Sequence, residues 1–309
     1  MPSPKTIRFI AVLLVTGVSL VFLSNCRSTP TLPGSQTPDT GTVVFTEVPA
    51  ATATITATPE PMALTVNGEG VPLAEYEAQW MQLQAADAEL GKTRSPEEQR
   101  QLVLDELIDQ TLLAQAAAEG GFQIDDAGLQ ERIDALAANL GGQAALDAWM
   151  AANGYSPVSF RSAMRRAAAS AWQRDALINA VPERVEQVRA QQILVRQRDT
   201  ADGVIRQLDA GADFATLAAK YDPNTGGILG WFPRGYLTQP AVEEAAFALQ
   251  PGEYSQVVET DFGYHIIYVL ERESDRILSV DARLTLQHLA LDSWLADRRS
   301  ASTVEILLP

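Results

Sequence analysis

The sequence predicts an α+β protein in which a helical domain is followed by a smaller domain of mixed strands and helices. Helix-start signals recur between residues 73 and 180, short strand and helix patterns alternate from residue 183 onward, and one more helical pattern lies near the C-terminus. At roughly 150 residues per domain, a chain of 309 residues is long enough for about two domains.

Composition and charge exclude several classes of protein. Apolar residues make up 46% and charged residues 20% of the chain, proportions typical of a globular protein. The 23 basic and 39 acidic side chains give a net charge of −16, which opposes binding to a nucleic acid. One cysteine and two histidines are too few for an internal disulfide or a structural zinc site. We therefore expect no nucleic-acid partner, no metal and no cofactor.

The first 26 residues have the pattern of a lipoprotein signal peptide. Two basic residues precede an uncharged apolar run, Phe9 to Leu23, which is followed by Ser24-Asn25-Cys26. The run is short for a membrane span, which needs about 20 residues. The end of the run resembles a bacterial lipobox, and this resemblance implies that Cys26 is lipidated, although Asn25 replaces the usual small residue. An uncleaved anchor helix is the alternative. Both predict an extracytoplasmic protein on the bacterial cell membrane.

Residues 27–62 are predicted to be a disordered linker. They are rich in Thr, Pro, Ser and Ala, and they contain no helical or strand period long enough to bury a face. A proline-punctuated chain of this kind is semi-extended and can hold a globular body away from a membrane surface. The linker and signal together carry no net charge, so the whole excess of acidic residues lies beyond Met62.

Residues 63–182 are predicted to form the helical domain. Ala63-Leu64-Thr65-Val66 has a strand pattern that ends at the turn dipeptide Asn67-Gly68, and a helical apolar period starts at Leu73. Ser95-Pro96-Glu97-Glu98 supplies a cap, a first-turn proline and a glutamate for a long helix. This helix is expected to end at Gly120-Gly121. The next helix is expected to start at Asp125 or Asp126 and to end at Gly141-Gly142, a further one to end at Asn153-Gly154, and the last to start at Ser156-Pro157.

Residues 183–275 are predicted to form the mixed domain, with the element order β-α-α-α-β-β. The predicted elements are a strand at 188–195, helices at 201–208, 214–220 and 242–249, and strands at 254–258 and 264–270. A turn-rich stretch, Tyr221 to Gly227, separates the second helix from Leu229-Gly230-Trp231-Phe232.

Six motifs of this domain, in order, resemble the parvulin family of peptidyl-prolyl cis-trans isomerases. They are QQILV, GADFATLAAKY, GGILGWFPRGYL, PAVEEAAFAL, PGEYSQVV and TDFGYHII. The helical domain and a predicted helix from Asp281 to Arg298 further resemble the PrsA and SurA type of extracytoplasmic foldase. The resemblance covers about residues 63–305. It implies that residues 276–309 pack on the helical, chaperone-like domain and that the parvulin-like domain is inserted between the two segments.

The chemistry that this resemblance implies needs no covalent intermediate. An Xaa-Pro bond isomerises slowly because its partial double-bond character sets a barrier of about 18 to 20 kcal/mol. A site that grips the proline ring and favours the twisted amide lowers that barrier, and each 1.36 kcal/mol gives about tenfold in rate.

The resemblance also implies which residues form the site. The polar, catalytic set is His265, Thr260, Gln192 and Asp222. The apolar cup for the proline ring is Leu229, Leu237 and Val242, with Phe232 and Phe247 packed behind it.

Strand alternation supports part of this set independently. It places His265 on one face with Ile267 and Val269, and Gln192 on one face with Leu194, where the amide could hydrogen-bond to a neighbouring ring nitrogen.

Three departures from the family pattern bear on activity. Gln192 stands where the family usually has histidine, Ile228 replaces an acidic residue in a shorter turn, and Val242 replaces phenylalanine, which makes the cup shallower. Two functions remain open. The first is a prolyl isomerase and folding chaperone that acts on unfolded exported polypeptides containing Xaa-Pro bonds. The second is a non-catalytic holdase with a degenerate parvulin domain.

Overall fold

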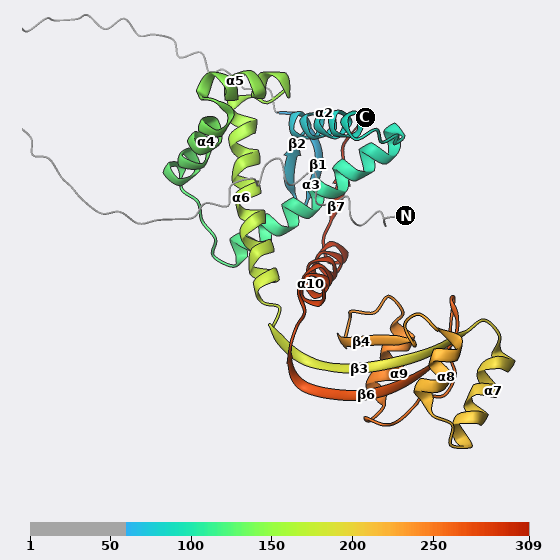
Figure 1. Ribbon diagram of the computed structural model, residues 1–309. Helices are drawn as coiled ribbons and strands as arrows, with labels where there is room; N and C mark the ends of the chain where they lie inside the picture. Colours follow the sequence, from blue (N-terminus) through green and yellow to red (C-terminus); the bar gives the residue numbers. More distant parts are fainter. Residues whose placement is uncertain (1–59, 309) are drawn as a thin grey trace, which may run out of the picture.

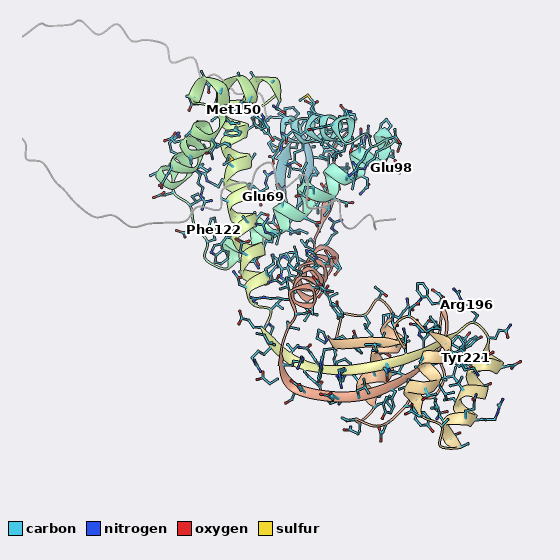
Figure 2. The ribbon with its side chains drawn as sticks, in the orientation of Figure 1. Glu69, Glu98, Phe122, Met150, Arg196 and Tyr221 are labelled. Atoms are coloured by element: carbon cyan, nitrogen blue, oxygen red, sulfur yellow. The ribbon has the colours of Figure 1, made fainter. Side chains whose placement is uncertain are left out.

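The computed structural model describes residues 60–308 and arranges them in two bodies joined by a pair of long strands (Figure 1). The predicted signal peptide, its Cys26 and the predicted linker up to residue 59 lie outside the described residues. Within residues 60–308, no helix combines the length and the apolar character that a membrane span requires. Side chains fill both bodies, with Phe122 and Met150 in the helical body and Arg196 and Tyr221 in the mixed one (Figure 2).

The helical body is built from both ends of the described chain. Its helices are α2 (Leu73–Glu89), α3 (Pro96–Glu119), α4 (Asp126–Leu140), α5 (Gln143–Ala152), α6 (Pro157–Asn179) and α10 (Val280–Ser300). Its sheet has the order β2-β1-β7, with β1 (Met62–Val66), β2 (Glu69–Pro72) and β7 (Val304–Ile306). Leu64 of β1 pairs with Ile306 of β7. The three-residue strand β7 was not predicted, because so short a segment has no readable period.

Helix starts in this body follow the predicted capping signals. Ser95 and Glu98 form a reciprocal capping box on α3, in which the Glu98 carboxylate accepts from Ser95 N–H at 2.7 Å. Asp125 Oδ1 caps α4 by accepting from Gly128 N–H at 2.8 Å. Ser156 caps α6 before its first-turn proline.

A buried ion pair joins α2 to α6 in the helical body. Arg166 Nη1 lies 2.7 Å from Glu75 Oε1, and the two side chains are 5% and 1% exposed. Burial raises the pKa of the Glu75 carboxyl, and the Arg166 guanidinium opposes that shift. Removing one partner of such a pair leaves an uncompensated buried charge.

Helix α10 rests on the helical body, although it follows the mixed body in the chain. Arg299 near its C-terminal end pairs with Asp105 and Asp109 of α3. At its N-terminal half, Gln287 Nε2 donates to the Ile178 carbonyl of α6 at 3.3 Å. These contacts agree with the predicted fold class, in which the C-terminal helix packs on the N-terminal helices.

The mixed body is an antiparallel sheet with helices on both faces. Its elements are β3 (Arg184–Val195), α7 (Arg198–Asp209), α8 (Phe214–Tyr221), β4 (Ile228–Pro233), α9 (Pro240–Ala248), β5 (Val258–Thr260) and β6 (Gly263–Ile277), and the strand order is β4-β3-β6-β5. Helices α7 and α8 pack with Ile193 and Ile266 on one face. Helix α9 packs with Ile267 and Val269 on the other.

The structure corrects three strand predictions in this body. Residues 228–233 form a strand, β4, which was not predicted because Gly230, at φ 75°, and Pro233 interrupt the strand pattern. The strand expected at 254–258 is displaced to Val258–Thr260, and Tyr254 makes only an isolated bridge. Strand β6 continues seven residues past Leu270 as a charged ribbon with β3, in which Arg184 pairs with Asp275 at 2.9 Å.

We predict that Arg166→Ala lowers the free energy of unfolding by about 3 to 5 kcal/mol, because it leaves the buried Glu75 carboxylate without its charged partner. The matched control is Arg165→Ala on the same helix. Arg165 pairs with Asp126, which is 84% exposed, so its loss should cost less than about 1 kcal/mol. Chemical denaturation followed by far-ultraviolet circular dichroism measures both values. Equal losses would contradict the prediction.

Candidate functional site

The candidate site lies on the α9 face of the mixed body's sheet, around His265. Strand β6 places the His265 side chain on the same face as Ile267 and Val269, which belong to the α9 core, whereas Ile266 belongs to the α7 and α8 core. The predicted alternation is therefore confirmed. The imidazole is 4% exposed, so its polar atoms need partners within the protein.

Both ring nitrogens of His265 have such partners. Nδ1 lies 2.8 Å from Gln192 Oε1, and Nε2 lies 2.8 Å from Thr260 Oγ1. Gln192 is on β3, two residues before Leu194, the residue that pairs with His265 across the ladder. The predicted hydrogen bond between the Gln192 amide and a ring nitrogen is thus present. Three of the four predicted polar residues form one connected unit.

In the neutral ring, these partners select the tautomer that carries its proton on Nδ1. The amide oxygen of Gln192 only accepts, so Nδ1–H donates to it and Nε2 accepts from the Thr260 hydroxyl. The Thr260 oxygen in turn accepts from Phe262 N–H at 3.1 Å. Burial lowers the pKa of His265 below its ordinary value of 6.5. The site therefore contains an uncharged, oriented imidazole at neutral pH.

An apolar cluster lies beside the imidazole on the same face. Val242, Phe232 and Phe247 are buried in it, and Leu229 and Leu237 are half-buried at its edge. Phe232 and Phe247 meet edge to face with ring centroids 6.0 Å apart. Of this set, Leu229 and Leu237 have surface left for a ligand, while Phe232, at 0% exposed, can only support them.

Asp222, the fourth predicted polar residue, is not joined to the imidazole. Its carboxylate accepts from the Thr225 hydroxyl and from the N–H groups of Asn224 and Thr225, at 3.1 and 3.2 Å, inside the turn after α8. The Thr225 hydrogen bond lowers the pKa of Asp222. Gln192 and Thr260 occupy both ring nitrogens, so the hydrogen bonds of Asp222 lie in this turn and not at the imidazole.

The turn closes tightly against the strand that carries Gln192. Gln192 N–H donates to the Gly227 carbonyl at 2.8 Å. A β-carbon on Gly227, which has φ 69°, would lie 1.9 Å from the Gln192 carbonyl oxygen. Only glycine fits here, and the turn ordered by Asp222 thereby fixes the backbone next to the site.

Sequence reasoning missed the exposed apolar side chains around the polar set. Leu194 pairs with His265 and is 37% exposed, and Phe262 follows Thr260 and is 55% exposed. Ile228 begins β4 and is 62% exposed. The position of Leu194 on the Gln192 face was a signal for its location. Nothing in the sequence marked Phe262, which lies in a turn.

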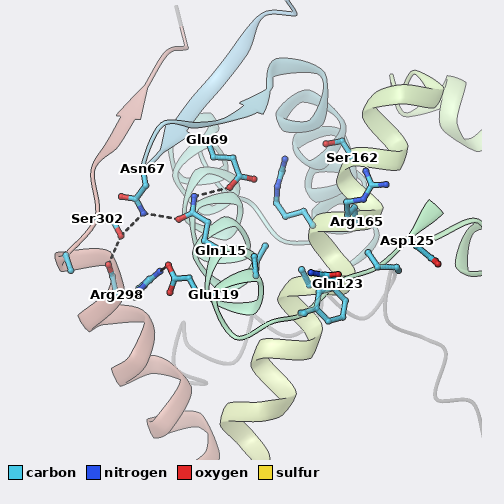
Figure 3. Close-up of a pocket in the computed structure, with 17 residues that line it drawn as sticks. Asn67, Glu69, Gln115, Glu119, Gln123, Asp125, Ser162, Arg165, Arg298 and Ser302 are labelled. Atoms are coloured by element: carbon cyan, nitrogen blue, oxygen red, sulfur yellow. Dashed lines mark hydrogen bonds and ion pairs between the residues drawn. The ribbon is translucent and has the colours of Figure 1, made fainter. Parts of the chain in front are cut away.

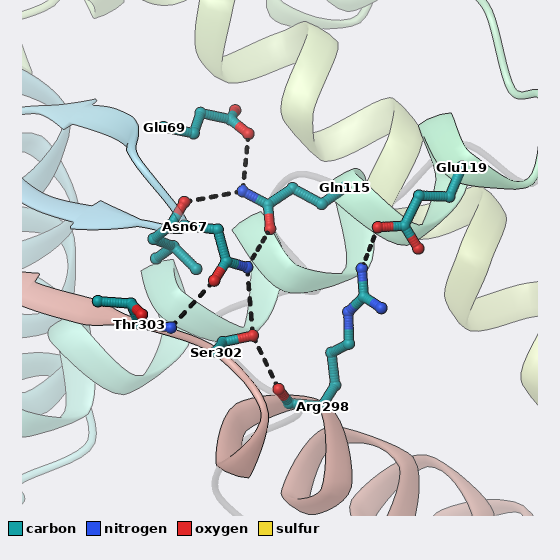
Figure 4. A network of polar contacts seen from close by, with 8 residues as sticks. Asn67, Glu69, Gln115, Glu119, Arg298, Ser302 and Thr303 are labelled. Carbon is teal, nitrogen blue, oxygen red and sulfur yellow. Dashed lines mark hydrogen bonds and ion pairs between the residues drawn. The ribbon is translucent and has the colours of Figure 1, made fainter.

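A hollow lies in the helical body, away from His265. It measures about 1070 Å³ and is lined by the β1–β2 turn, by α3 and α6, and by the end of α10 (Figure 3). Asn67 Nδ2 donates to Gln115 Oε1 at 2.9 Å and to Ser302 Oγ at 3.2 Å, and Arg298 pairs with Glu119 (Figure 4). One wall of the hollow is therefore a polar network that ties the C-terminal segment to α3 and the hairpin.

Comparisons with known proteins match two domain families to successive parts of the chain. Residues 162–273 match the family model of the PPIC-type PPIase domain, and residues 41–172 match that of the SurA-like N-terminal domain. The foldase protein PrsA of Geobacillus kaustophilus is 46% identical over 94 residues, which cover 29% of this chain and 33% of that protein. The chaperone SurA of Methylobacillus flagellatus is 40% identical over 119 residues, which cover 35% of this chain and 27% of that protein.

The matched region spans about a third of the length of these relatives. A crystal structure of PrsA from Bacillus cereus aligns with 79% of this chain and 88% of its own, at 18% identity and a TM-score of 0.43. The two family matches together extend from residue 41 to residue 273. The chain therefore contains a SurA-like N-terminal domain and a PPIC-type PPIase domain, which agrees with its resemblance to PrsA/SurA-like parvulin proteins.

Proposed function

We propose that this protein is a peptidyl-prolyl cis-trans isomerase and folding chaperone for exported polypeptides. The observation that carries the proposal is the neutral imidazole of His265, held by Gln192 and Thr260 beside an apolar cluster. The substrates would be unfolded or folding chains that contain Xaa-Pro bonds. The reaction needs no metal or cofactor, because rotation about the amide breaks no covalent bond.

In this proposal the cup and the polar unit have separate tasks. Leu229 and Leu237 contact the proline ring, and Val242, with Phe232 and Phe247 behind it, supports them. The resonance form that makes the amide planar separates charge, so an apolar, water-poor surface favours the twisted amide over the planar one. His265 and Thr260 lie next to the Xaa-Pro amide bond of the substrate as an uncharged, oriented pair. Gln192 orients the ring, a task that does not require a titratable group.

Asp222 enters the proposed mechanism indirectly. Its carboxylate orders the turn whose Gly227 carbonyl accepts from Gln192 N–H. We therefore assign Asp222 a positioning role for the strand that carries Gln192, and no role at the reacting bond.

The helical body would supply the chaperone function. Its hollow of about 1070 Å³ combines apolar side chains such as Phe122 and Ile124 with amide, hydroxyl and charged groups. Such a lining suits a polypeptide, which offers both apolar side chains and backbone hydrogen-bonding groups. A holdase without catalysis remains the alternative, and the catalytic test below separates the two.

The location and domain limits follow from the sequence. We propose a lipoprotein signal peptide at residues 1–26, lipidated at Cys26, and a linker at 27–62 that tethers the body to the extracytoplasmic membrane face. The chaperone-like domain would comprise residues 63–182 and 276–309, with the isomerase domain at 183–275 inserted between them.

We predict that His265→Ala lowers kcat/KM for isomerisation of a proline peptide by about tenfold or more, a loss of about 1.4 kcal/mol of transition-state stabilisation. The matched control is His288→Ala, which alters the other histidine, on the exposed side of α10, and should leave the rate unchanged. Circular dichroism confirms that both variants fold. No rate enhancement by the unmodified chain, together with suppressed aggregation of an unfolded client, would select the holdase.

The lowered pKa of His265 predicts how the rate depends on pH. Because burial holds the pKa of His265 below 6.5, the ring is mostly neutral at neutral pH and becomes charged as the pH falls into the acid range, so kcat/KM should be level around neutral pH and decline in acid. In Gln192→Glu, a carboxylate next to Nδ1 favours the charged ring and should shift the decline to higher pH. A direct, protease-free isomerisation assay from pH 5 to 8 measures both profiles. Identical profiles would show that His265 is not the titrating group.

Lipid attachment is predicted to require Cys26, the sole cysteine of the chain. Cys26→Ser should abolish incorporation of a labelled fatty acid in cells and release the protein from the membrane fraction. Labelling that persists in this variant would contradict the anchor, while membrane association without labelling would favour the uncleaved helix.

A further inference from the structure

The loop at residues 234–239 carries Leu237, one of the two cup residues with surface left for a ligand. Its backbone is anchored by Glu243 of α9. The Glu243 carboxylate accepts from the N–H groups of Gly235, Tyr236 and Leu237 at 2.6, 3.0 and 3.1 Å. Three charge-assisted hydrogen bonds to one side chain are a strong restraint. They fix the backbone of Leu237 relative to the helix that also carries Val242.

The outer side of the same loop lies against α10 of the helical body. A β-carbon on Gly235, which has φ 82°, would lie 2.7 Å from Leu289 Cδ2 and 3.3 Å from Leu286 Cδ2. The leucine side chains thus approach the loop backbone as closely as a glycine allows. The N–H of Gly235 also makes the shortest of the three hydrogen bonds to Glu243. The loop is therefore contacted at Gly235 by Glu243 on one side and by the leucines of α10 on the other.

Helix α10 is itself fixed, so it can act as a wall for this loop. Arg283 pairs with Glu183 at 3.0 Å, and Gln287 Nε2 donates to the Ile178 carbonyl at 3.3 Å. Leu278 N–H donates to the Glu183 carbonyl at 2.9 Å at the point where the chain leaves the sheet. These contacts hold the first half of α10 on the end of α6 while Leu286 and Leu289 face the loop.

We propose that Glu243, Leu286 and Leu289 are positioning residues for the isomerase site, and that α10 thereby makes the helical body part of that site. Glu243 holds the loop backbone toward α9, and the two leucines block its outward movement. Leu237 is half-buried, so the loop position determines how far its side chain closes over a proline ring. This inference rests on the proposed isomerase function, and its test is arranged so that the two fail separately.

The decisive comparison is Leu289→Ala against Leu284→Ala in the full chain. The two leucines are 46% and 49% exposed, and a helical periodicity of 100° per residue places Leu284 on the side of α10 away from Leu286 and Leu289. Leu289→Ala should raise KM for a proline peptide by about three- to tenfold with little change in kcat, and Leu284→Ala should change neither. Equal effects of the two variants would overturn the proposal.

A double-mutant cycle tests whether the leucine acts through Leu237. In a Leu237→Ala background, the loop no longer presents a side chain to the ring, so Leu289→Ala should have little further effect on KM. Glu243→Gln, which places an amide NH₂ against the loop N–H groups, should behave like Leu289→Ala. Additive effects in the cycle would mean that Leu289 acts elsewhere, which would also overturn the proposal.

Two controls separate this outcome from other failures. Thermal unfolding of each variant shows whether a loss reflects unfolded protein, which would lower the apparent kcat and leave KM unchanged. If the unmodified chain does not accelerate isomerisation at all, the proposed function fails. If the unmodified chain is active and Leu289→Ala matches Leu284→Ala, only the positioning role fails.

Discussion

The antiparallel pairing of β3 with β6 is the constraint on which the rest of this structure depends. It runs from Arg184–Ile277 at one end to Val195–Tyr264 at the other, and it carries the chain out of the helical body and back (Figure 1). Its register sets which side chains share a face. A slip of one residue would turn His265 into the α7 and α8 core and move Gln192 away from it.

The chemistry of the site follows from the position that this pairing gives to His265, which is buried and hydrogen-bonded at both ring nitrogens. Burial of a histidine disfavours its charged form, and an acceptor at Nδ1 together with a donor at Nε2 satisfies the neutral ring completely. The amide of Gln192 performs this task without a second titratable group. Beside the ring, half-buried leucines leave apolar surface, so an uncharged polar unit and an apolar cluster lie next to each other.

The two bodies are not independent units in sequence, because α10 and β7 follow the mixed body in the chain and yet belong to the helical body. The chain enters and leaves the mixed body at one place, where Leu278 N–H donates to the Glu183 carbonyl, and the C-terminal segment then completes the helical body through β7 and the Asn67–Ser302 contact. Because α10 belongs to the helical body yet touches Gly235, a movement between the bodies would be transmitted to the loop that carries Leu237.

Local signals in the sequence determined the helices, since Ser95, Asp125 and Ser156 cap them through contacts three residues away. Alternation along β6 determined the face of His265, and motif order determined the fold class. The tertiary structure alone decided the charged extension of β6, the strand β7 and the contact of Leu289 with Gly235. Each of these features depends on a contact between segments far apart in the sequence, and the hydrophobic period of one segment does not reveal which other segment it contacts.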